Sequence, residues 1–121
     1  MEQNEAEGDI RLTEPTARFL RIADLEKRQT QEGNRYLEIL RVPAMSAGLY
    51  ALSAGGTDLQ RPHRQDEIYY VISGRARFQA DKEDREISAG SVLFVAAGVV
   101  HRFYDITEDL AVLVVFAPAE T

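Results

Sequence analysis

The sequence predicts an all-β fold, a barrel or a sandwich built from short strands. Three observations predict it. Short stretches rich in β-branched and aromatic residues follow one another from residue 35 to the end of the chain. Turn signals containing glycine or proline separate these stretches at regular intervals. Only one segment, near the N-terminus, has the composition of a helix.

The N-terminal part of the chain is expected to hold this one short helix. Residues 1–9 are polar and acidic and offer little to bury, so we expect them to be disordered, with residues 10–121 forming a single domain. Residues 10–22 mix polar and apolar side chains and are interpreted as an edge strand. Residues 23–32 carry good helix formers and are followed by Gly33, which predicts a helix that ends there.

The rest of the chain is expected to be strands and turns. Ser73–Gly74 is a turn signal, and we expect it to join the strands on either side as a hairpin. The expected strands are 35–42, 47–53, 67–72, 75–80, 85–87, 91–95, 101–106 and 110–117.

Composition excludes several classes of function. The net charge of −6 argues against nucleic-acid or membrane-surface binding, because both reward a basic face. The sequence has no cysteine, which excludes disulfides and thiol chemistry and fits a cytoplasmic protein. The acidic N-terminus does not resemble a signal peptide, and the longest apolar stretch is too short to span a bilayer. We therefore expect a small-molecule partner.

Two strands are apolar on both faces. Ile68, Tyr70 and Ile72 lie opposite the face that carries Glu67, and residues 110–117 are also apolar on both sides. Such strands are covered on both faces, here either by the N-terminal segment or by a second subunit. We expect a homodimer.

The two histidines of the chain carry the strongest chemical signal. Glu67 follows His63 by four residues, and alternate residues of a strand share a face, so the two side chains can point the same way. His101 would join them if its strand lies across a barrel. Two imidazoles and a carboxylate suit divalent transition metals. Alternatively, the histidines are satisfied by ordinary hydrogen bonds, and Glu67 pairs with Arg61 or Arg64.

Two stretches of the chain carry residues at a characteristic spacing. The first is Gly55, five residues, Arg61-Pro62-His63, three residues, Glu67, six residues and Gly74; the second is Gly90, five residues, Ala96-Ala97-Gly98, two residues, His101, three residues and Asp105. This spacing resembles the two motifs of the cupin superfamily. Ten positions keep the family's spacing and seven keep its residue type. The three departures are Arg61 for histidine, Ala96 for proline and Asp105 for asparagine.

The resemblance, which is to small single-domain bacterial cupins, implies a double-stranded β-helix, the jelly-roll barrel of this family. It also implies that His63, Glu67 and His101 bind a divalent transition metal such as Fe, Mn, Ni or Zn, with the fourth usual ligand absent. Arg61 cannot ligate a metal. Its side chain either turns away and leaves a position to water, or enters the pocket to bind a carboxylate or Glu67.

The resulting functional hypothesis is a metal-dependent enzyme of dioxygenase, isomerase or lyase type that acts on a small molecule, either anionic or neutral. Tyr69 shares the face of Glu67 and is a candidate to donate a proton or hydrogen bond to a substrate, although a structural role in the barrel is the commoner one. Arg61 and Phe103 are the other candidates for substrate contact. The alternative is a non-enzymatic binding module whose metal is structural or absent.

Overall fold

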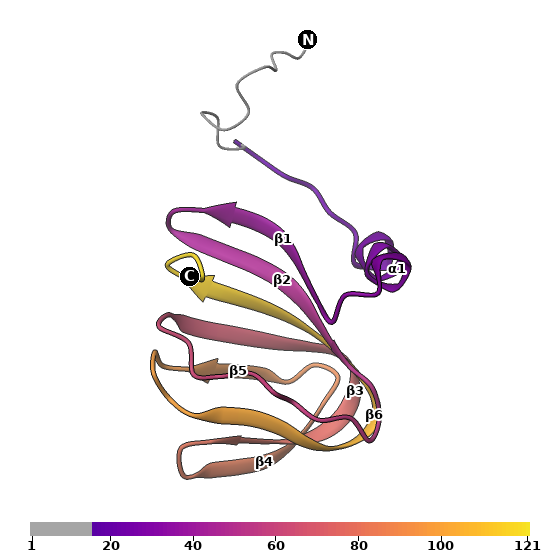
Figure 1. Ribbon diagram of the computed structural model, residues 1–121, viewed down its shortest axis with the longest axis vertical. Coiled ribbons are helices and arrows are strands. Elements are labelled where there is room, and N and C mark those ends of the chain that lie inside the picture. The colour runs from indigo at the N-terminus through magenta and orange to yellow at the C-terminus, as the bar shows by residue number, and fades with distance from the viewer. Residues whose placement is uncertain (1–15) are drawn as a thin grey trace.

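Six antiparallel strands form a curved sheet in the computed structural model, which describes residues 16–121 (Figure 1). The strand order is β1-β2-β6-β3-β4, and β5 also pairs with β3. The prediction of an all-β barrel with one short N-terminal helix is confirmed for the described residues. The elements are α1 (Ile22–Glu32), β1 (Tyr36–Val42), β2 (Met45–Leu52), β3 (Asp66–Ala80), β4 (Glu83–Ser88), β5 (Val92–Val95) and β6 (His101–Ala117).

The N-terminal predictions have a mixed outcome. The disorder predicted for residues 1–9 lies outside the described residues, as does the first part of the edge strand predicted over residues 10–22. Residues 16–21 form no strand, and α1 begins at Ile22, so the described part of that prediction is wrong. The predicted helix itself is confirmed, and it ends at Gly33, whose N–H donates to the carbonyl of Gln29 over 2.9 Å.

The hairpin predicted at Ser73–Gly74 is wrong. The chain continues through these residues as one long strand, β3, which pairs along its length with the slightly longer β6. The register shifts between Val71 and Arg77, where β3 bends. Its first half pairs with β5 and its second half with β4. The two halves of β3 therefore pair with different strands, one on each side of the bend.

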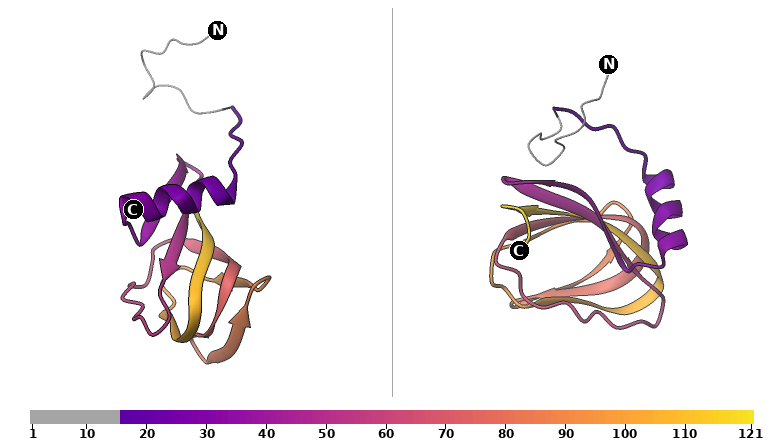
Figure 2. Two further views of the ribbon diagram at one scale, coloured as in Figure 1. Left: turned by 90° about the vertical axis from the view of Figure 1, so that its right-hand side faces the viewer. Right: turned by 45° about the horizontal axis from the view of Figure 1, so that its top comes forward.

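Helix α1 packs on the outside of the sheet, across β1 and β2 (Figures 1 and 2). Leu25 of the helix forms an apolar cluster with Leu37 and Leu49 of these strands. The buried Gln29 donates hydrogen bonds to the carbonyls of Arg35 and Leu49, each over 3.0 Å. These contacts fix the helix against the sheet. This helix, the one that the structure describes, is not long enough to cross a membrane.

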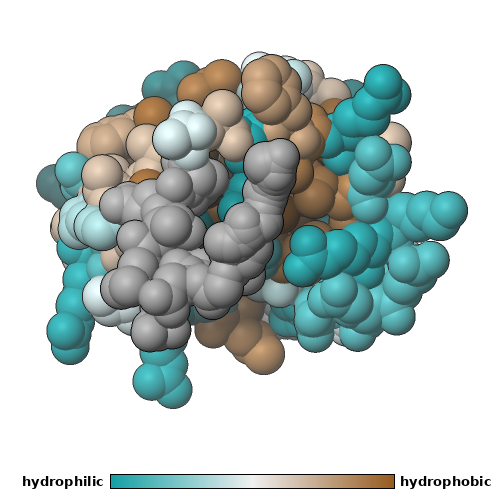
Figure 3. Space-filling view, turned by 90° about the horizontal axis from the view of Figure 1, so that it is seen from above, coloured by the Kyte–Doolittle hydropathy of each residue, from teal (hydrophilic) through white to brown (hydrophobic). Residues whose placement is uncertain are grey.

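The helix covers only part of the outer apolar face. Ile72 packs against the cluster under α1. Ile68 and Tyr70 are 49% and 44% exposed, and their cross-strand neighbours Phe94 and Val92 are more exposed still. The N-terminal segment described here therefore covers one of the two ends of this face. The face seen from above carries polar side chains mainly along one side and apolar side chains toward its middle (Figure 3).

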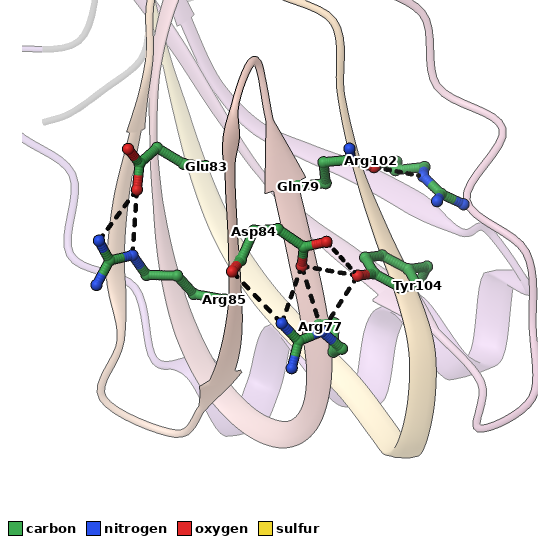
Figure 4. A network of polar contacts seen from close by, with 7 residues as sticks. All are labelled: Arg77, Gln79, Glu83, Asp84, Arg85, Arg102 and Tyr104. Carbon is green, nitrogen blue, oxygen red and sulfur yellow. Dashed lines mark hydrogen bonds and ion pairs between the residues drawn. The ribbon is translucent and has the colours of Figure 1, made fainter.

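A network of polar side chains covers the outer surface around β4 (Figure 4). The hydroxyl of Tyr104 lies 2.7 and 2.6 Å from the two carboxylate oxygens of Asp84 and accepts from Nε of Arg77 over 3.1 Å. The hydrogen bond from Tyr104, together with Arg77, lowers the pKa of Asp84. Because these groups are exposed to water, the network contributes little to stability. It makes this surface polar.

Candidate metal centre

Three segments that are distant in sequence meet at the inner face of the barrel. Glu67 and Tyr69, two residues apart, both point to the inward face of β3, as the sequence predicts. His63 belongs to the loop before β3, and its carbonyl accepts a hydrogen bond from the N–H of Gly98 over 2.8 Å. Gly98 lies in the turn before β6, and His101 is the first residue of that strand. This backbone contact holds the two histidine-bearing segments together.

His63, Glu67 and His101 each bring one ligand atom within 4.8 Å of the others. Nε2 of His101 lies 3.5 Å from Oε2 of Glu67, and both side chains are almost completely buried. Two donors of one ion with bonds of about 2.1 Å lie roughly 3.0–4.2 Å apart. The three side chains therefore need only a small closing movement to share a single ion.

Hydrogen bonding fixes the orientation of His101. Its Nδ1 lies 2.8 Å from the carbonyl of Val99, to which it donates. The lone pair of a neutral imidazole then belongs to Nε2, which faces the interior and lies 3.0 Å from the hydroxyl of Tyr69. This is the tautomer that a metal requires, with the other ring nitrogen held by a backbone carbonyl.

His63 has acceptors on both sides of its ring. Nδ1 lies 3.0 Å from a carboxylate oxygen of Glu120, near the C-terminus. Nε2 lies 3.2 Å from Oε1 of Gln60. Burial lowers the pKa of His63, which favours the neutral imidazole that binds metals. The contact with Glu120 orients the ring in the same way that the carbonyl of Val99 orients His101.

Glu67 supplies the clearest sign of a missing partner. Its Oε1 is buried and has no hydrogen-bond partner in the described structure. Burial raises the pKa of Glu67, because the carboxylate has lost its water. An unpartnered buried carboxylate oxygen costs free energy that a bound cation would recover. With two imidazole nitrogens beside it, this donor set fits a divalent transition metal ion.

The other candidates for substrate contact lie in different surroundings. The side chain of Arg61 is exposed and does not line the cavity of the site. Phe103 is 1% exposed and packs against the rings of Tyr69 and Phe78, in the aromatic core. Tyr69 touches this core and also lines the cavity. Of the three, only Tyr69 reaches the space beside the histidines.

A cavity of about 200 Å³ opens beside His63. Sequence reasoning missed several of its polar residues. Gln60 is the last of the five residues between Gly55 and Arg61, positions that the first motif leaves unspecified. Tyr36, Tyr50 and Glu120 lie outside both motifs, and no sequence signal marks them. The cavity is lined by Tyr36, Tyr50, Gln60, His63, Tyr69, Val114, Phe116 and Glu120.

Comparison with known proteins agrees with this geometry. A family model described as a cupin domain matches residues 48–116, more than half of the chain. The uncharacterized protein SCO3923 of Streptomyces coelicolor is 50% identical over 101 residues, which cover 84% of this chain and 96% of the relative.

Solved structures show the same fold at low sequence identity. KdgF from a Halomonas species matches with a TM-score of 0.63 and 21% identity, over 69% of this chain and 78% of that one. An RmlC-like cupin with a double-stranded β-helix fold, from Methanocaldococcus jannaschii, matches with a TM-score of 0.62 and 15% identity, over 69% and 78% of the two chains. The predicted double-stranded β-helix is thus confirmed, and the chain belongs to the cupin family.

Proposed function

We propose that this protein is a small metal-dependent enzyme, of oxygenase, isomerase or lyase type. His63, Glu67 and His101 would hold one Fe, Mn, Ni or Zn ion. The observation that carries the proposal is the buried, unpartnered Oε1 of Glu67 beside two imidazoles. A structural role alone would not explain a buried carboxylate oxygen left without a hydrogen-bond partner.

The residues around the site suit a chemical role. A divalent ion held by His63, Glu67 and His101 would supply Lewis-acid chemistry to a bound substrate oxygen or water. Burial raises the pKa of Tyr69, so its hydroxyl keeps its proton and can donate it to a substrate oxygen. The hydroxyl of Tyr36 is buried, lines the same cavity and has no partner among the described residues. It is a second donor ready for a substrate.

The cavity limits the substrate to a compact molecule. Its 200 Å³ is below the usual range for drug-sized ligands, which starts at about 300 Å³. Val114 and Phe116 offer apolar contact, and Glu120 is the one acidic side chain among the lining residues. Because Arg61 lies outside the cavity, an anionic substrate would depend on the metal for its positive charge. We therefore propose a small molecule that chelates the ion through oxygen.

Metal analysis of the purified, tag-free protein tests this proposal. We expect one transition metal ion per chain, either as isolated or after incubation with Fe(II), Mn(II), Ni(II) or Zn(II). The loaded protein should then consume a compound from a pool of small metabolites, as followed by mass spectrometry. Protein that takes up no metal would overturn the proposal. Metal-loaded protein that binds a compound and releases it unchanged would support the binding module instead.

We also propose that a second copy of the chain covers the exposed end of the outer face. The cross-strand pairs Ile68–Phe94 and Tyr70–Val92 form an apolar patch on two neighbouring strands. An apolar patch of this kind can pack against its own copy across a two-fold axis without any charge complementarity. This arrangement supports a homodimer built through β3 and β5.

The Phe94→Glu substitution tests the dimer. Phe94 is 65% exposed, so a charge there leaves the isolated chain folded but would be buried without a partner in the dimer. We expect the variant to be monomeric by analytical ultracentrifugation at concentrations where the wild type is dimeric. Leu59→Glu, at a 73% exposed position in the loop before β3, is the control and should stay dimeric. A monomeric wild type would rule this interface out.

A further inference from the structure

The side chain of Gln60 reaches the metal centre from the loop before β3. Its Oε1 lies 3.2 Å from Nε2 of His63 and accepts a hydrogen bond from the hydroxyl of Tyr69 over 3.2 Å. Gln60 also lines the cavity, whereas its neighbour Arg61 does not. The oxygen of Gln60 is therefore the additional oxygen donor that faces His63 on the side of the ring directed away from Glu120.

Asp58 holds the amide of Gln60 in this orientation. Nε2 of Gln60 donates to Oδ2 of Asp58 over 2.9 Å, which leaves Oε1 directed at His63. Asp58 is itself anchored on two strands, because it accepts from the hydroxyl of Tyr50 over 2.7 Å and from the N–H of Phe103 over 2.9 Å. Turning the amide over would bring its oxygen against the carboxylate of Asp58. The carbonyl end is thus directed into the site by a fixed neighbour.

The character of the contact between Gln60 and His63 depends on which ring nitrogen of His63 carries the proton. An imidazole that binds a metal is neutral and carries one proton. With that proton on Nδ1, donated to Glu120, Nε2 presents a lone pair to the carbonyl oxygen of Gln60. Two acceptors then face each other at hydrogen-bond distance. A metal ion that accepts both lone pairs turns this contact into shared coordination.

The spacing also fits. With metal–ligand bonds of about 2.1 Å, neighbouring donors lie about 3.0 Å apart in octahedral and about 3.4 Å apart in tetrahedral geometry. The 3.2 Å between Gln60 and His63 lies in this range, and the 3.5 Å between Glu67 and His101 is close to it.

We infer that Gln60 is the fourth ligand of this metal centre and binds the ion through its side-chain oxygen. It takes the role that Arg61, the residue at the motif position, cannot fill. The site then has two imidazole nitrogens and two oxygens, one from Glu67 and one from Gln60. Asp58 is the positioning residue that holds the amide. The inference rests on the proposed metal centre and adds to it Gln60, which stands at a position that the first motif leaves unspecified.

Titration with Co(II) alone tests the inference without any substrate. Full-length protein, freed of metal with a chelator, is titrated while the visible absorption of Co(II) is recorded, and affinity is measured by competition with a chromophoric chelator. We expect Gln60→Leu to weaken Co(II) binding at least about 10- to 100-fold, the loss seen when even an outer partner of a metal site is removed. Its spectrum should also change, because one donor is lost.

Arg61→Leu is the matched control, one residue away, and should leave affinity and spectrum unchanged. Gln60→Glu keeps an oxygen at the same place and should bind Co(II) at least as tightly as the wild type, even if Gln60→Leu folds poorly. Wild-type affinity in folded Gln60→Leu, or weaker binding by folded Gln60→Glu, would overturn the inference while the three-residue metal centre stands. A wild type that binds no Co(II) would instead overturn the metal centre itself.

Discussion

We expect the His101→Ala variant to change from stoichiometric metal uptake to none. His101 is the more deeply buried of the two histidines, and the hydrogen bond from its Nδ1 to the carbonyl of Val99 leaves Nε2 facing Glu67. Loss of an outer-shell partner alone costs about 10- to 100-fold in metal affinity, so loss of a ligand should exceed about 100-fold. Metal content by mass spectrometry and calorimetric titration would measure this loss.

The variant must also be shown to fold. Truncating a buried ring of this size costs about 2–4 kcal/mol, within the stability of about 5–15 kcal/mol that is typical of a small domain. Val112→Ala, in the core of the same strand, is the control, because it destabilises the barrel without removing a ligand. We expect it to bind metal normally. If folded His101→Ala retained stoichiometric metal, His101 would not be a ligand.

The sequence could predict that His63, Glu67 and His101 lie together, because motif spacing carries backbone geometry as well as chemistry. Asp105 is an example. It stands where the family motif has asparagine, and the structure gives it a positive φ of 47° and an exposed side chain. Asparagine and aspartate are the non-glycine residues that best tolerate this conformation. The residue type at position 105 is therefore explained by the backbone conformation of β6 rather than by an interaction with His101.

The rest of the site depends on contacts between distant segments that no local pattern encodes. Glu120 reaches His63 because its N–H donates to the side-chain oxygen of Ser46 over 2.9 Å, which ties the C-terminal residues to β2. Gln60 is placed by Asp58, which is in turn held by Phe103 on β6. In both cases, the position of the side chain follows from the closure of the barrel. Local sequence can name such residues only after the sheet topology is known.

The error at Gly74 has the same origin. A glycine after a run of β-branched and aromatic residues is typical of a hairpin turn. Here its φ of 101° serves a bend within β3, where the strand passes close to the backbone of β6. A side-chain carbon at this position would lie 2.3 Å from the carbonyl oxygen of Asp109 and 2.7 Å from Cα of Leu110. Glycine is thus required both for the conformation and for the close approach of the two strands.

We therefore expect Gly74→Ala to be among the most destabilising single substitutions in the barrel. Strain at a positive φ alone costs a non-glycine residue about 1–2 kcal/mol. The overlap with Asp109 and Leu110 adds to this, because both contacts are backbone atoms of a paired strand and cannot move without breaking the ladder. We expect a total loss of about 4 kcal/mol or more in the free energy of unfolding, measured by urea denaturation.

Gly90→Ala separates the two causes of this loss. Gly90 has a similar φ of 94°, but a side-chain carbon there would meet no atom within 4 Å. The Gly90→Ala variant should lose only the free energy that the backbone strain costs, about 1–2 kcal/mol. Equal losses in the two variants would mean that β3 and β6 do not approach each other as closely as described. A much larger loss at Gly74 would show that this glycine is required for the close contact between β3 and β6. The closure of the barrel depends on that contact, and so does the meeting of His63, Glu67 and His101.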